Sequence, residues 1–184
     1  MRIDSITKSY AVRAGLVTFL LLSISGRAIA VRDDSQQLTQ VLGEARDEAA
    51  ELARDADEMG SLIRTDVSWQ THAVMLDHIK DHLNNMARIV AKLSDIRSSG
   101  SELQQQAVDR ILPLVKELAA NTTAAINYLN QNKSRPNTDP YTQYLHDNVE
   151  TAHQLSSTVS SLFEYEKSMT KIAKLKSQLE LSGQ

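Results

Sequence analysis

The stretch "QLTQVLGEARDEAAELARDADEMG", residues 37–60, decides the fold class. Its apolar residues recur at steps of three and four, which places them on one face of an α-helix. Acidic and basic residues alternate on the opposite face, a pattern typical of a solvent-exposed helix surface. The apolar face comprises Leu38, Val41, Leu42, Ala45, Ala49, Leu52, Ala53, Ala56, Met59 and Ile63. The stretch therefore predicts a long amphipathic helix that must be buried against other helices.

Three further helices are expected from the same period. Residues 64–69, "RTDVSW", are poor helix-interior residues and predict a break. Gly100 and Ser101 supply a helix stop and a helix start, and Asp139 with Pro140 supplies another start. Alternating strand patterns are absent from the sequence. We expect an all-α, up-down antiparallel four-helix bundle whose C-terminal helix overhangs by about two turns, with helices near 35–64, 67–97, 101–131 and 139–179.

The fourth predicted helix has a serine-rich region in the middle of its apolar face. Its serine-rich centre, "QLSSTVSS" at residues 154–161, carries little side-chain bulk, so a neighbouring helix could approach closely. Stepping along it by three and four residues at 100° each predicts the core-facing positions: Tyr141, Leu145, Val149, Ala152, Ser156, Val159, Phe163 and Thr170.

The first 30 residues have the features of a secretory signal peptide. Basic residues precede an uncharged apolar run at 14–24, and the small residues Ala28 and Ala30 stand where a signal peptidase reads. We expect cleavage after Ala30, which leaves residues 31–184 as one exported bundle domain, periplasmic or secreted. The run is shorter than the roughly 20 residues of a comfortable membrane span, although an uncleaved anchor is the alternative. No cysteine follows it, which excludes a lipoprotein anchor.

Composition restricts the chemistry of the exported chain. Residues 31–184 contain 16 basic and 22 acidic residues, a net charge of −6. This charge argues against nucleic acid as a partner, because the phosphate backbone selects basic surfaces. The chain has no cysteine, which excludes disulfides, thiolate metal sites, iron–sulfur clusters and covalently attached haem.

The stretch "WQTHAVMLDHIKDHLNNM", residues 69–86, raises the question of a metal or haem site. His78 and His82 are four residues apart, the spacing that places two imidazoles on one helix face. Non-covalent haem held by His82 and either Met75 or Met86 is geometrically conceivable. The chain contains neither Glu-x-x-His nor His-Glu-x-x-His. We favour the simpler interpretation, in which His72 and His82 hydrogen-bond across helices at the edge of the core, His78 is solvated, and the methionines fill the core.

Two other features bear on function. Trp69 is expected to close one end of the bundle. The lysines of the tail "KSMTKIAKLKSQL", residues 167–179, are expected to complement the helix dipole, and docking on an anionic membrane or a partner helix is the alternative. No phosphate-binding loop, nucleophile elbow or persuasive catalytic triad is present, so we do not expect an enzyme. The sequence favours a structural or protein-interaction role without a cofactor, and the alternative is a metal- or haem-binding bundle. The sequence pattern selects no oligomeric state.

Overall fold

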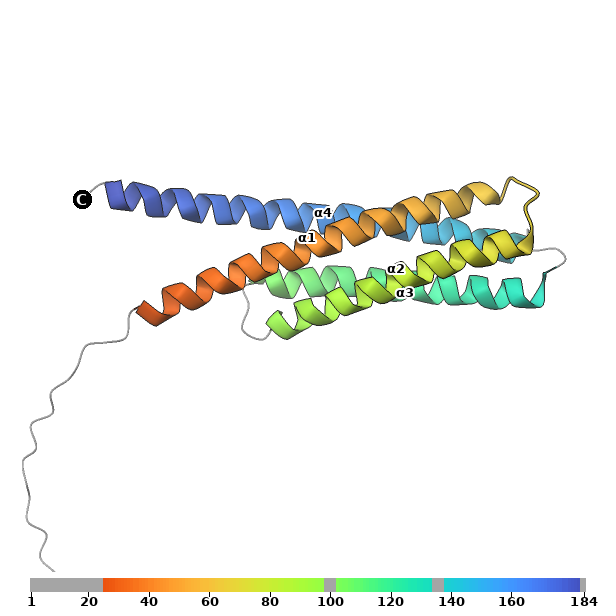
Figure 1. Ribbon diagram of the computed structural model, residues 1–184, viewed down its shortest axis with the longest axis horizontal. Coiled ribbons are helices and arrows are strands. Elements are labelled where there is room, and N and C mark those ends of the chain that lie inside the picture. The colour runs from red at the N-terminus through yellow and green to blue at the C-terminus, as the bar shows by residue number, and fades with distance from the viewer. Residues whose placement is uncertain (1–24, 98–101, 134–137, 183–184) are drawn as a thin grey trace, which may run out of the picture.

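The computed structural model describes the backbone of residues 25–97, 102–133 and 138–182, and most side chains from residue 37 onward. Four long α-helices account for nearly all of these residues (Figure 1). They are α1 (Ser25–Leu62), α2 (Trp69–Arg97), α3 (Glu102–Gln131) and α4 (Asp139–Ser182). The described residues contain no β-strand.

The helices form a four-membered ring in chain order. α1 packs against α2 and α4, and α3 packs against the same two helices. The connection between α1 and α2 is short, so these neighbours run antiparallel. The expected up-down bundle is therefore confirmed, and the break between α1 and α2, residues 63–68, lies within one residue of the predicted 64–69.

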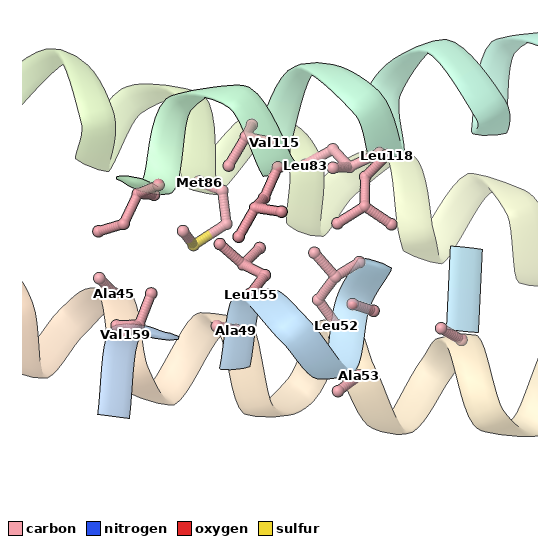
Figure 2. Close-up of a cluster of buried hydrophobic side chains, with 14 of the residues drawn as sticks. Ala45, Ala49, Leu52, Ala53, Leu83, Met86, Val115, Leu118, Leu155 and Val159 are labelled. Atoms are coloured by element: carbon pink, nitrogen blue, oxygen red, sulfur yellow. The ribbon is translucent and has the colours of Figure 1, made fainter. Parts of the chain in front are cut away.

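Side chains from all four helices meet in one continuous core (Figure 2). In the layer that Figure 2 labels, α1 contributes three small residues, Ala45, Ala49 and Ala53, and one large side chain, Leu52. Near the end of α1, a Cβ added to Gly60 would lie 2.9 Å from Cγ2 of Val149 on α4. The small residues thus allow the backbones of α1 and α4 to approach closely.

The start of α1 differs from the prediction. The cap-forming residues Asp34 and Ser35 suggest a helix start near residue 35, but α1 begins at Ser25. Arg27, Ala28 and Ala30 are good helix formers, and no proline intervenes to end the helix. Residues 1–24 of the expected signal peptide lie outside the described residues, so cleavage after Ala30 stays a prediction. Among the described residues, no helix is long and apolar enough to cross a membrane.

The buried face of α4 also differs from the predicted one. Tyr141, Leu145, Ala152 and Val159 are buried as expected, but Thr170 is exposed. Because polar residues occupy part of the buried face, stepping between apolar residues drifts away from it. The predicted positions Val149, Ser156 and Phe163 are only half-buried, and the buried positions that the apolar pattern misses are Asn148, Thr151, Leu155, Leu162 and Glu166.

Candidate functional site

His82 lies at the interface between α1 and α2 and contacts two carboxylates of α1. Its Nδ1 lies 2.6 Å from Oε1 of Glu48, and its Nε2 lies 3.3 Å from Oδ2 of Asp55. The side-chain amide of Asn85 donates a second hydrogen bond to Oε1 of Glu48, at 2.9 Å. The histidine side chain is 23% exposed, whereas that of Asp55 is 9% exposed. The expected cross-helix hydrogen bonding of His82 is thus confirmed.

The structure separates His78 from this polar cluster. His78 is exposed, as expected for a solvated residue. Both ring nitrogens of His82 face carboxylates of α1, so a metal ion at His82 would have to displace one of these contacts. The described residues contain no group of three or more histidine, aspartate or glutamate side chains arranged to hold a metal ion. The metal hypothesis for His78 and His82 stays a prediction, and elemental analysis of the purified protein would test it.

The methionines of the haem hypothesis belong to the hydrophobic core. Met86 is fully buried and Met75 nearly so. Figure 2 shows the Met86 side chain packed in the layer that contains Leu83, Val115 and Leu155. A haem ligated by Met86 would have to displace these side chains. Its presence is testable by the absorption spectrum of the purified chain.

His72 forms a second polar contact, at the end of the bundle near the α1–α2 connection. The ring is fully buried, and Nδ1 lies 3.1 Å from the hydroxyl oxygen of Tyr141 on α4. Burial without compensating charge lowers the pKa of His72 and raises the pKa of Tyr141. His72 Nε2 is buried and has no hydrogen-bond partner among the described residues. His72 is therefore more deeply buried than the expected boundary position.

Trp69 packs against the core at the same end of the bundle. It is half-buried, in agreement with the expectation that it closes this end. The ammonium nitrogen of Lys133 lies 4.4 Å from the centroid of its ring, a cation–π contact from the end of α3. The face of the indole is thus covered by Lys133, which makes Trp69 a structural residue in this arrangement.

We expect acidification to destabilise the fold through His72. Above its unfolded pKa of 6.5, His72 is neutral in both states and has no effect. Below 6.5 the unfolded chain takes up the proton more readily than the buried ring does. The full free energy of unfolding is therefore retained above pH 6.5. It falls as the pH drops through the window between 6.5 and the lower folded pKa of His72, with a limiting slope of about 1.4 kcal/mol per pH unit.

Urea unfolding at about pH 7.5 and about pH 5.5 measures this effect. His72→Leu should lose less stability on acidification than the wild type does. His78→Leu is the matched control, because His78 is exposed and its replacement should leave the pH dependence unchanged. An unchanged pH dependence in His72→Leu would contradict the assignment.

The most unusual surface of the molecule is the C-terminal part of α4. Every residue from Lys167 to Glu180 is exposed, which corresponds to about four helical turns and about 21 Å of helix. Figure 1 shows this segment extending past the ends of α2 and α3, while the start of α1 diverges from it. We call residues 167–180 the α4 overhang. It is longer than the expected two turns.

An apolar stripe runs along the α4 overhang from its base at Tyr165. At 100° per residue the side chains of the stripe fall within an arc of about 120°. They are the exposed residues Tyr165 (54% exposed), Met169 (46%), Ile172 (47%), Leu175 (49%) and Leu179 (73%). Of the large apolar residues that are exposed in the described part of the chain, all but Val74 lie in this stripe. The stripe is therefore a concentrated apolar surface and not scattered exposure.

The α4 overhang also differs from the rest of the chain in charge. It contains four lysines and one glutamate, a net charge of +3. Residues 31–166 carry 12 basic and 21 acidic residues, a net charge of −9. On the helical wheel Lys167, Lys171 and Lys174 lie beside and behind the apolar stripe, whereas Lys176 lies within it. The overhang is thus a basic amphipathic helix attached to an acidic bundle.

A groove between α3 and α4 leads onto the stripe. It has a volume of about 460 Å³ and contains the apolar residues Leu103, Leu162 and Tyr165. Polar side chains line it as well, namely the oppositely charged Glu102 and Arg110 together with Gln106 and Ser161. Since Tyr165 belongs to both the groove and the stripe, the two form one continuous surface.

Comparisons with known proteins leave the function to be argued from this geometry. No protein-family model, characterised protein or solved structure matches the chain. The function is therefore inferred from the residues of the bundle and of the α4 overhang, because fold class by itself does not determine activity.

Proposed function

We propose that this chain is an exported, non-catalytic helical bundle that binds another protein through the α4 overhang. The observation that carries the proposal is the exposed apolar stripe from Tyr165 to Leu179. A contiguous apolar surface of this kind on a soluble protein is typical of an interaction site. The four-helix bundle serves as the rigid base from which the helix projects.

The length of the α4 overhang supports this role. An isolated helix shorter than about 12–15 residues is only marginally stable in water, because its stability normally comes from packing of its apolar face. The packed part of α4 nucleates the overhang, but the 14 exposed residues have little of the burial that stabilises a helix. Contact with a partner would bury the stripe and stabilise the helix, so binding and helix stability are coupled.

Photo-crosslinking in the cells that produce the protein tests the proposal. A photoreactive amino acid in place of Ile172 should form a covalent adduct with a second protein, because Ile172 lies in the middle of the stripe. The matched control is the same replacement at Val74, an exposed apolar residue of α2 outside the stripe. We expect adducts from position 172 and not from position 74.

A charged substitution completes the experiment. Leu175→Asp, combined with the photoreactive residue at position 172, should abolish the adduct while the thermal stability of the chain is retained, since Leu175 is 49% exposed. If position 172 gives no protein adduct, or if positions 172 and 74 give the same adducts, the proposed function is wrong.

A further inference from the structure

We infer that the groove and stripe on α4 accept an amphipathic partner helix with acidic flanks, an inference that rests on the proposed function. From the groove, which the largely buried Leu162 lines, to Leu179 in the stripe, the surface extends about 26 Å at the rise of an α-helix. A partner helix of about 18 residues spans this length. Helix-in-groove recognition uses apolar anchors at steps of three and four residues, the same spacing as the stripe presents.

The shape of the base favours a helix over a lipid surface. The groove lined by Leu103 and Leu162 is concave and large enough, at about 460 Å³, to accept apolar side chains. A side chain of a partner helix can enter it, whereas the flat surface of a bilayer cannot. The acidic bundle beside the overhang, with its net charge of −9, would also be repelled by anionic lipid headgroups.

The charge of the overhang selects among protein partners. Two overhangs from two copies of the chain would each bring a net charge of +3 to the interface, so symmetric pairing of overhangs is opposed by repulsion. Glutamate or aspartate at the edges of the apolar face of a partner helix would instead lie near Lys171, beside the stripe, and Lys176, within it. Glu102 and Arg110 offset one another in the groove, so the preference comes from the lysines of the overhang.

Two synthetic peptides provide the direct test. Both contain 18 residues with leucines at the same helical positions, and they differ only in carrying glutamate or lysine on the flanks. Fluorescence anisotropy with the full exported chain should give a Kd at least about tenfold lower for the acidic peptide, a difference of about 1.4 kcal/mol. Binding should weaken as salt is raised, because exposed charges are screened.

Variants of the chain test where the peptide binds and which residues set the preference for the acidic peptide. Leu175→Asp should weaken binding of the acidic peptide at least about tenfold, and Val74→Asp should leave it unchanged. The double variant Lys171→Glu, Lys176→Glu should reduce the preference for the acidic peptide or reverse it, since it replaces the two lysines nearest the stripe by acidic residues. Equal Kd values for the two peptides, or no binding of either, would overturn the inference.

The other possible occupants are separate outcomes of the same experiment. Vesicles containing anionic lipid that sediment the protein while the acidic peptide does not bind would assign the surface to a membrane and overturn the inference. A dimer that is lost in Leu175→Asp would assign it to a second copy, with the same consequence. If position 172 crosslinks to a protein in cells but the acidic peptide does not bind, the charge class of the partner is wrong and the proposed function stands. If position 172 gives no protein adduct and the acidic peptide does not bind, the proposed function and the inference are both wrong.

Discussion

Replacing Leu52 by alanine is expected to lower the free energy of unfolding by about 3 kcal/mol. Leu52 is fully buried and lies in the layer with Leu118 and Leu155 (Figure 2). Its neighbours on α1 include the small residues Ala49 and Ala53, so no large side chain of α1 is available to fill the space left by truncation. The loss therefore combines the transfer free energy of the removed methyl groups with the cost of the cavity.

Leu175→Ala is the matched control, since the chemical change is the same and only the environment differs. Leu175 is 49% exposed in the α4 overhang, and we expect its truncation to change stability by less than about 0.5 kcal/mol. Urea titration followed by circular dichroism measures both variants. Equal losses in the two variants would contradict the separation between a packed core and an exposed overhang.

The helices were predictable because the signals for them are local. Apolar spacing within one turn, the break-forming residues within 64–69 and the helix-start signals of the sequence at Ser101 and Asp139 lie within a few residues of the helix ends that they predict. α2 and α3 accordingly begin within two residues of their predicted starts. The start of α1 was missed because Asp34 and Ser35 are good caps in sequence but are also tolerated inside a long helix.

The buried polar residues were missed because apolar spacing cannot register them. Asn148 on α4 is buried, and its side-chain amide donates to Thr122 on α3 at 3.2 Å. Its burial depends on a partner 26 positions away in the sequence. A pattern of apolar residues assigns such a position to the surface, and for that reason the predicted face of α4 drifts toward Phe163 and Thr170.

Only part of the candidate interaction surface was predictable from the sequence. The lysines and apolar residues of 167–179 are visible as a basic amphipathic segment, and docking on a partner helix is one of its expected roles. The length over which α3 leaves α4 uncovered depends on how the two helices align. Glu102, near the start of α3, lines the same groove as Tyr165 of α4, so the remainder of α4 extends beyond α3. That alignment is a tertiary property, and it determines which apolar residues remain exposed.

Replacing His82 by leucine is expected to lower the free energy of unfolding by about 2 kcal/mol. The sequence favours the opposite result, because His82 lies at the edge of the apolar arc of α2, where leucine fits. The contacts of His82 reverse this expectation. Leucine would leave Glu48 and the buried carboxylate of Asp55 without the imidazole that faces them at 2.6 and 3.3 Å.

His78→Leu is the matched control for His82→Leu, one helical turn away on an exposed position. It should change stability by less than about 0.5 kcal/mol. The expected loss at His82 is smaller than for a fully buried ion pair, because Asn85 still donates to Glu48 and Arg54 still lies 3.6 Å from Asp55. A double-mutant cycle with Asp55→Asn isolates the contribution of the His82–Asp55 contact. If His82→Leu were as stable as the wild type, the carboxylates of α1 would not depend on His82, and the interface between α1 and α2 would be held by its apolar residues.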